Sequence, residues 1–296
     1  MSTRRAPKAI LIAGPTASGK SALALDMALS RRGVIINADS MQVYAEMRVL
    51  TARPTVEEEA AVPHRLYGHV SAAEPYSVAQ WLEEVEREID KVTSNEELPI
   101  IVGGTGLYFK ALLEGLSPVP PIPQEVRNRW RDAGTSMPPA DLHAELQRRD
   151  AETAALLRPS DRQRIVRALE VIEATGRPLV RWQQIKGRPV LTEDDVAKFV
   201  VTRARSELYE RAGRRFRQML EEGALAEAER MAQMQLAPAL PAMRALGLQP
   251  LIDLLSGKVS REAAIESAER DTRHFIKRQL TWLRRYMISW KAMSAQ

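Results

Sequence analysis

Apolar residues follow two alternating patterns along the first third of the chain. Short continuous runs at residues 9–13, 34–37 and 98–102 are typical of buried strands. Between them, residues 21–30 and 77–93 place apolar side chains at the three- and four-residue spacing of an amphipathic helix. Strands that alternate with helices predict an α/β fold in which helices cover both faces of a parallel sheet.

The pattern changes after residue 116. Residues 117–123 contain four prolines, and between residues 111 and 185 all eleven basic residues are arginine. Arginine suits bidentate phosphate contacts and base stacking, which favours an RNA-facing insertion. Ten acidic residues in the same span nearly cancel this charge, so a solvated helical subdomain fits equally well. A strand near residues 199–201 then returns to the sheet. We therefore predict a core formed by residues 1–117 and 186–296 and a mostly helical insertion at 118–185.

The composition of the chain excludes several classes of protein and of functional site. The 296 residues include no cysteine, which excludes disulfides, thiolate metal sites and a cysteine nucleophile and indicates a reducing compartment. No apolar run approaches the ~18 residues of a membrane span. The first predicted strand begins near Lys8, which leaves little room for a leader peptide. The net charge of +5 favours a polyanionic partner only mildly.

A phosphate-binding loop follows the first predicted strand. Its pattern is G-x-x-x-x-G-K-S, and its residues are Gly14, Pro15, Thr16, Ala17, Ser18, Gly19, Lys20 and Ser21. Glycines let successive backbone N–H groups point at one phosphate, and the following helix adds its positive N-terminal end. Lys20 can reach the outer phosphates, and the Ser21 hydroxyl is placed to ligate Mg²⁺. The motif predicts phosphate binding without defining the phosphate compound.

Two further segments end predicted strands at the edge where parallel sheets bind ligands. Asp39 follows the second strand, and it could hold Mg²⁺ through water, cap the next helix or act as a base. Thr105 lies in a glycine-rich turn after the third strand, where its hydroxyl could face a ligand. A tight strand-to-helix turn explains that segment equally well.

Together, these segments resemble the tRNA dimethylallyltransferase (tRNA isopentenyltransferase) family in its bacterial form. The resemblance runs through most of the chain, and the C-terminal stretch from Asp271 to Arg284 looks like the family's closing helix. It rests on these strings: Gly-Pro-Thr-Ala-Ser-Gly-Lys-Ser at Gly14, Ala-Asp-Ser-Met-Gln-Val-Tyr at Ala38, Val-Pro-His at Val62, Val-Gly-Gly-Thr-Gly-Leu-Tyr at Val102, Asp-Arg-Gln-Arg-Ile-Val-Arg-Ala-Leu-Glu-Val at Asp161 and Ala-Thr-Gly-Arg-Pro-Leu at Ala174.

The resemblance implies a P-loop NTPase-like fold and a role for each matching residue. The phosphate loop with Lys20 would hold the diphosphate of dimethylallyl diphosphate, assisted by Arg215 and by Mg²⁺ on Ser21. Asp39 would be the general base, and Thr105 would contact the same target nucleotide. The expected tRNA contacts are Asp39, Ser40, Met41, Gln42, Thr105, Arg127, Gln163, Arg164, Ile165, Val166 and Arg167.

The reaction implied is transfer of a dimethylallyl group to N6 of the adenine 3′ of the anticodon, in tRNAs that read codons starting with U. The expected partners are the tRNA anticodon stem-loop and the prenyl donor, and a cytoplasmic monomer without membrane contact is expected. Departures from the family pattern occur at Arg65, at 248–250 and at 158–161, outside the phosphate loop and Asp39. A P-loop small-molecule kinase, an adenylate isopentenyltransferase acting on free nucleotide and a non-catalytic RNA-binding module are the alternatives.

Overall fold

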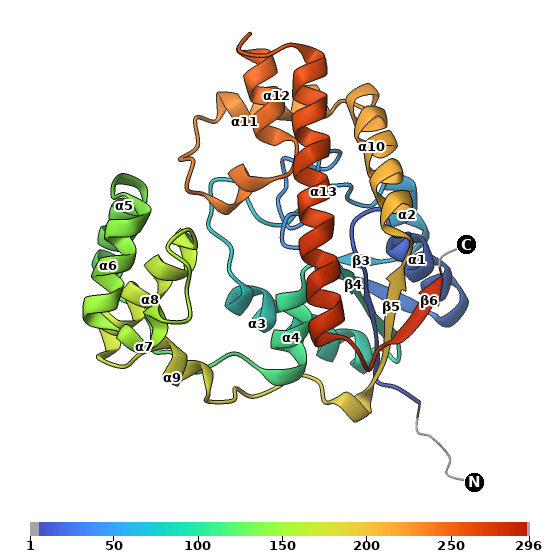
Figure 1. Ribbon diagram of the computed structural model, residues 1–296. Helices are drawn as coiled ribbons and strands as arrows, with labels where there is room; N and C mark the ends of the chain where they lie inside the picture. The colour runs from blue at the N-terminus through green and yellow to red at the C-terminus, as the bar shows by residue number, and fades with distance from the viewer. Residues whose placement is uncertain (1–5, 295–296) are drawn as a thin grey trace. The chain divides into compact units, whose positions relative to one another are not determined.

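The computed structural model describes residues 6–294, and a parallel β-sheet forms the centre of the unit made by residues 6–113 and 190–294 (Figure 1). In the described chain the sheet has six strands in the order β3-β2-β4-β1-β5-β6, and each neighbouring pair is parallel. The strands are β1 (Ala9–Ala13), β2 (Gly33–Asn37), β3 (His64–Arg65), β4 (Leu98–Gly103), β5 (Val196–Thr202) and β6 (Lys291–Ser294). The predicted α/β class is confirmed, although the sequence reading missed the short edge strands β3 and β6.

Alternate residues of the central strand β1 enter the two cores of the sheet. Ala9, Leu11 and Ala13 pack on the face covered by α3 (Val78–Ser94) and α4 (Gly106–Glu114), where Trp81 and Phe109 are buried. Ile10 and Ile12 pack on the opposite face against α1 (Lys20–Arg31). Because β1 is buried on both faces, its sequence is a continuous apolar run rather than an alternating one.

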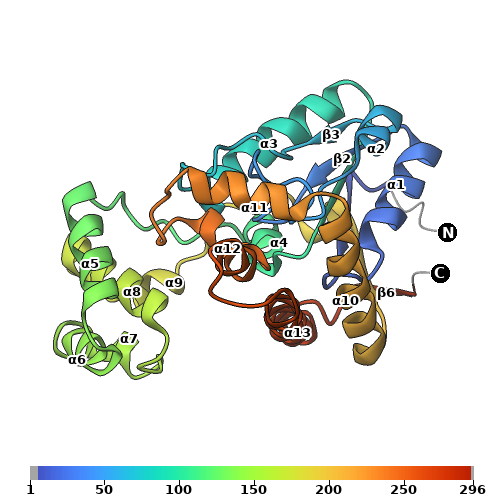
Figure 2. The ribbon, with the colours of Figure 1, turned by 90° about the horizontal axis from the view of Figure 1, so that it is seen from above.

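Helices late in the chain surround the end of the sheet that carries the phosphate loop. Helix α10 (Arg205–Glu221) runs beside the long helix α13 (Arg261–Tyr286), as seen from the side and from above (Figures 1 and 2). Helices α11 (Ala224–Gln233) and α12 (Leu248–Leu255) follow α10 and precede α13 in the chain. Their residues Met231 and Leu251 are buried in a cluster shared with Tyr44 and Met47. Three short helices complete the fold around the sheet: α2 (Val56–Ala61), early in the chain, and η1 (Glu193–Asp195) and η2 (Pro241–Arg244), late in it.

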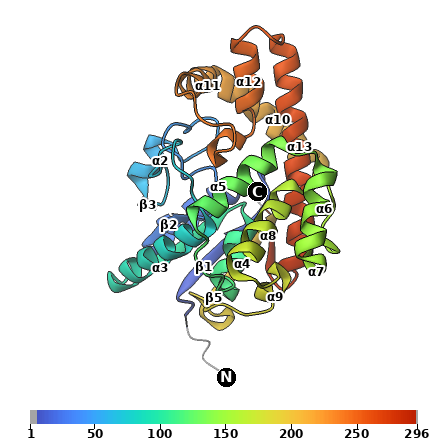
Figure 3. The same ribbon diagram turned by 90° about the vertical axis from the view of Figure 1, so that its left-hand side faces the viewer.

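Residues 114–189 form a second compact unit, distinct from the unit made by the residues up to 113 and from 190 onward. Its helices are α5 (Gln124–Ser136), α6 (Pro139–Arg149), α7 (Ala151–Ala154), α8 (Arg162–Thr175) and α9 (Leu179–Gln183), shown together in Figure 3. Trp130, Leu146 and Leu169 are part of its core. A β-carbon on Gly134 would lie 2.6 Å from Cγ2 of Val166, so a glycine is required where α5 meets α8.

None of the helices between residues 6 and 294 is both long enough and apolar enough to cross a membrane.

Candidate active site

The phosphate loop connects β1 to α1, as its sequence predicts. Gly19 takes a left-handed conformation with φ of 94°, and helix α1 begins at the next residue, Lys20. The backbone N–H of Ser18 donates to the carbonyl of Pro15 over 3.3 Å, which closes a tight turn. Because the loop curls directly before a helix, its N–H groups and the helix N-terminus are available to one anion.

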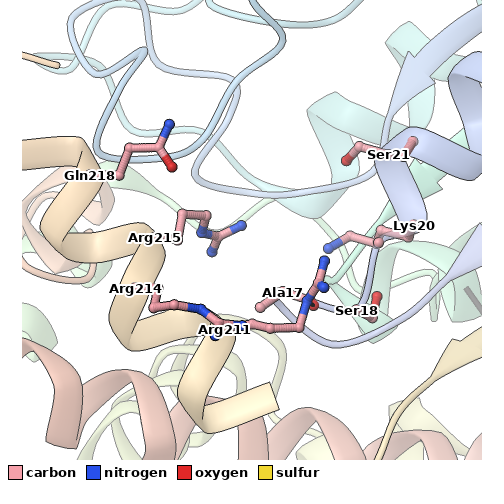
Figure 4. A pocket seen from close by; sticks show the side chains of 10 residues that line it. Ala17, Ser18, Lys20, Ser21, Arg211, Arg214, Arg215 and Gln218 are labelled. Atoms are coloured by element: carbon pink, nitrogen blue, oxygen red, sulfur yellow. Dashed lines mark hydrogen bonds between the residues drawn. The ribbon is translucent and has the colours of Figure 1, made fainter. Parts of the chain in front are cut away.

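A pocket of about 370 Å³ lies between this loop and helix α10 (Figure 4). One wall is residues 17–22, and the facing wall carries three arginine side chains and a glutamine. In Figure 4, Lys20 extends from the side of α1, and the side chain of Arg211 extends from α10 toward it. The lining on the α10 side consists of Arg211, Arg214, Arg215 and Gln218. The concentration of cations indicates an anionic ligand with more than one charge.

Three arginines hold consecutive residues of the loop. Arg215 donates to the hydroxyl of Thr16, Nε of Arg211 donates to the carbonyl of Ala17 over 3.0 Å, and Nε of Arg203 donates to the carbonyl of Ser18 over 3.1 Å. The structure thus places the predicted Arg215 at the loop. Sequence reasoning missed Arg211 and Arg203, although the arginines recurring between residues 203 and 217 were a usable signal.

Burial strongly affects the charges of this pocket. It lowers the pKa of the Lys20 ammonium from 10.5 to about 8, while the Asp39 carboxylate raises that pKa and the Arg215 guanidinium lowers it. Burial likewise lowers the pKa of Arg215, opposed by Asp39. A guanidinium remains charged despite such a shift, whereas an amine near 8 titrates in the physiological range. The charge of Lys20 therefore changes with pH near neutrality, whereas the charge of Arg215 does not.

Asp39 lies in the turn that follows β2, with its two carboxylate oxygens in different surroundings. Oδ1 accepts from the backbone N–H of Met41 over 3.0 Å, and the backbone N–H of Asp39 donates to Oδ1 of Asn37 over 2.8 Å. The carboxylate therefore closes a turn and does not cap a helix, since residues 38–55 contain none. Oδ2 faces Gly104, where a β-carbon would lie only 3.3 Å away.

Thr105 joins the Asp39 turn to the end of β4. Its Oγ1 accepts from the backbone N–H of Ser40 over 3.0 Å and lies 3.3 Å from the Ser40 hydroxyl. Its own N–H donates to the carbonyl of Ala38 over 3.2 Å. The structure therefore brings together Asp39, Ser40 and Thr105, which the sequence placed at separate strand ends.

Two other residues of this turn have structural partners. Nε2 of Gln42 donates to the carbonyls of Thr51 and Ala52 over 2.9 and 2.7 Å. Met41 is half-buried against the cluster of α11 and α12. The backbone near these residues is further held by buried Glu227, which accepts from the N–H groups of Val49 and Leu50 over 2.8 and 2.9 Å.

The remaining sequence-predicted residues belong to the helical unit of residues 114–189. Gln163 and Arg164 are exposed on α8, while Arg127 on α5 and Arg167 on α8 are half-buried. Val166 is half-buried against the core. The side chain of Ile165 is fully enclosed in that core. Because it reaches no surface, its side chain can only support its neighbours, and an RNA contact there is limited to the backbone.

The predicted Mg²⁺ site depends on Ser21. No group of three or more histidine, aspartate or glutamate side chains suited to a metal is found within residues 6–294. Mg²⁺ commonly keeps several waters and binds through one or two protein oxygens together with substrate phosphates. The exposed Ser21 side chain lines the pocket at the first turn of α1, so the residues fit a cation held mainly by a bound diphosphate.

The parallel sheet, the loop at the end of β1 and the cationic pocket define a P-loop protein of the α/β class. Residues 42–286 match the family model described as IPP transferase. The chain belongs to this family.

Curated relatives and solved structures agree with that assignment. The chain is 53% identical to the tRNA dimethylallyltransferase of Azorhizobium caulinodans, over 96% of this chain and 91% of the relative. It is 52% identical to that of Bradyrhizobium sp. (strain ORS 278), over 98% and 94%. A crystal structure of the tRNA isopentenylpyrophosphate transferase from Bacillus halodurans superposes with a TM-score of 0.69, at 32% identity over 97% of this chain and 90% of that one. A eukaryotic dimethylallyltransferase described as acting on tRNA gives a TM-score of 0.80, at 26% identity over 97% and 73%.

Proposed function

We propose that this protein transfers the dimethylallyl group of dimethylallyl diphosphate to N6 of the adenine 3′ of the anticodon in tRNAs that read codons starting with U. The family and the names of the relatives support tRNA prenylation. One structural observation carries the proposal. A β-carbon on Gly104 would lie 3.3 Å from Oδ2 of Asp39 and 3.5 Å from the carbonyl of Gly14, so the Asp39 carboxylate and the start of the phosphate loop approach the same point.

The donor is assigned to the pocket between the phosphate loop and α10. The loop N–H groups, Lys20 and Arg215 bind the diphosphate. Ser21 would hold Mg²⁺, which would add positive charge to the site. Negative charge grows on the diphosphate as the allylic carbon–oxygen bond breaks. Preorganised donors aimed at that charge stabilise the transition state, and removal of one typically costs ~10²–10³ in rate.

The acceptor is assigned to the turn that carries Asp39 and Thr105. The N6 lone pair forms the new carbon–nitrogen bond, the electrons of the breaking bond leave with the diphosphate, and a proton of N6 passes to Asp39 Oδ2. The exocyclic amine is a weak nucleophile because its lone pair is delocalised into the ring. A positioned base typically gains ~10²–10⁴ in such a step.

The target adenine must leave the stack of the anticodon loop to reach Asp39, which costs a few kcal/mol and less in a loop than in a duplex. Ser40, Met41 and Gln42 are assigned to this base, and Arg127, Gln163, Arg164, Val166 and Arg167 to the rest of the stem-loop. We further assign the protein to the cytoplasm as a monomer.

The test is incubation with Mg²⁺, radiolabelled dimethylallyl diphosphate and unmodified tRNA. We expect label in the tRNA and none when the adenine 3′ of the anticodon is replaced by guanine. Label in free AMP would instead support an adenylate isopentenyltransferase. Phosphate transfer from ATP without label in tRNA would support a small-molecule kinase, and tRNA binding without either activity would support a binding module.

A further inference from the structure

Gln279 connects the two halves of the candidate site through a single side-chain amide. It lies on α13, far along the chain from both halves, and is only 7% exposed. Its Oε1 accepts from the backbone N–H of Thr16 in the phosphate loop over 2.9 Å. Its Nε2 donates to the backbone carbonyl of Gly104, next to Thr105, over 3.0 Å. The two partners fix the orientation of the amide, because one can only donate and the other can only accept.

The contact is also sterically close. A β-carbon on Gly104 would lie 2.4 Å from Nε2 of Gln279, while Asp39 Oδ2 lies near the same point at 3.3 Å. The amide and the carboxylate therefore both approach the same side of Gly104. Thr16, at the other end, is bonded by Gln279 through its backbone and by Arg215 through its side chain. The amide thus touches one backbone group on the donor half and one on the acceptor half.

We propose that Gln279 is a positioning residue that fixes the distance between the diphosphate-binding loop and the turn carrying Asp39 and Thr105. This inference rests on the proposed function for its kinetic consequence. Transfer requires the allylic carbon and N6 to approach to about 3–3.5 Å in line with the leaving group. A misplacement of about 1 Å can cost ~10²-fold in rate, even when both substrates bind. Both hydrogen bonds of its amide go to backbone groups, so we expect its loss to act through Thr16 and Gly104.

The first test is Gln279→Met, which keeps the length of the side chain and removes both hydrogen bonds. With donor and tRNA both saturating, we expect single-turnover transfer to fall by ~10²-fold. The affinity for tRNA stays within a few-fold of the wild type. Gln279→Glu keeps an acceptor for Thr16 but loses the donor to Gly104, and we expect an intermediate rate. Gln249→Met, at an exposed glutamine on α12 whose amide donates to Asp253 in the same helix, is the matched control and leaves the rate unchanged.

The outcomes separate this inference from the proposed function. If the wild type prenylates tRNA and Gln279→Met regains the wild-type rate at saturating substrates, Gln279 serves only binding and the inference fails. If the wild type transfers nothing to tRNA, the proposed function fails, and amide hydrogen exchange still tests the connection. Faster exchange at Thr16 and at residues 103–106 in Gln279→Met than in Gln249→Met would support it. Equal exchange at both segments would overturn it.

Discussion

The two halves of the candidate site are held in different ways. The phosphate loop is bonded by side chains from distant parts of the chain, namely Arg203, Arg211, Arg215 and Gln279. The turn of Asp39 is held largely by its own neighbours, through Asn37, Met41 and the contact of Ser40 with Thr105. The donor half therefore depends on correct docking of α10 and α13, whereas the acceptor half depends on the ends of β2 and β4.

The same contrast appears in the charges. The donor half concentrates cations around a pocket, and burial lowers the pKa of its lysine. The acceptor half presents one carboxylate near tyrosines. Burial first and the charge of Asp39 second raise the pKa of both Tyr67 and Tyr108, so both phenols stay protonated. One half is arranged to bind negative charge and the other to receive a proton. This division leads to predictions that should affect the two halves separately.

The largest effect is expected from Asp39→Asn. The amide keeps an oxygen for the N–H of Met41 but cannot accept the N6 proton, so we expect single-turnover transfer to drop by ~10²–10⁴. Affinity for the donor and for tRNA should stay within a few-fold. Asp26→Asn, the same change at an exposed position on α1, is the control. Retention of full transfer by Asp39→Asn would remove the assignment of the base.

Lys20→Ala tests the donor half and should rank second. It removes a cation that faces the developing charge of the diphosphate, so we expect weaker donor binding together with a rate loss of ~10²–10³. Binding of tRNA in the absence of donor should not change. If the affinity for tRNA fell in parallel with the affinity for the donor, Lys20 would not act on donor binding alone, and the division of the site into two halves would be contradicted.

The lowered pKa of Lys20 also predicts how diphosphate binding depends on pH. Only the ammonium form attracts the anion, so affinity measured without metal should fall as the pH rises through about 8. For folding the sign is opposite. The folded pKa lies below the unfolded 10.5, so the buried ammonium destabilises the protein below about 8, and this cost disappears as the pH rises from about 8 to 10.5. Lys20→Arg, which stays charged, should bind diphosphate with no such fall, as calorimetry at pH 7 and 9 can show.

A smaller loss is expected from Arg215→Gln. The amide can still bond the Thr16 hydroxyl but removes one cation of the pocket, and a hydrogen bond to a charged group contributes about 1.5–3 kcal/mol. That range corresponds to a loss of about ten- to a hundredfold in diphosphate affinity. The exposed Arg217, which pairs with Glu269, supplies the control Arg217→Gln. Equal losses in both variants would point to general charge rather than to a specific contact.

The sequence predicted the parts of this site that depend on local pattern. The phosphate loop was recognisable because its glycines and Lys20 occupy fixed offsets between a strand and a helix, and both flanking elements were predicted. Asp39 and Thr105 were found because parallel strands end at one edge of the sheet. Roles for Arg215 and Asp39 needed the family resemblance. Without it, Arg215 was indistinguishable from a solvated arginine on an amphipathic helix.

Long-range contacts were beyond the sequence reading. Gln279 and Glu227 act through partners more than a hundred residues away, and nothing in the local spacing marks them. Strand β6 pairs with β5 after α13 has returned the chain to the sheet. Its four residues are mostly exposed, so they do not form the continuous apolar run by which the other strands were predicted. The contact of Tyr286 with Trp282 is likewise not evident from the sequence: Tyr286 is 40% exposed, and its ring lies at a centroid distance of 4.3 Å from that of Trp282, tilted by 35°.

The smallest effect is expected outside both halves, at Arg164 on α8. Its side chain is 70% exposed and pairs with Asp161 one turn earlier. If it contacts one tRNA phosphate, Arg164→Ala should weaken tRNA binding a few-fold and lower the slope of log affinity against log salt by ~1. Donor affinity and the saturated rate should not change, since neither Asp39 nor the phosphate loop is touched. Arg148→Ala is the matched control, because Arg148 on α6 is also exposed and also pairs with one acid within a turn, Glu145. An identical salt slope in both variants would show that the acceptor half ends at the Asp39 turn and does not extend to α8.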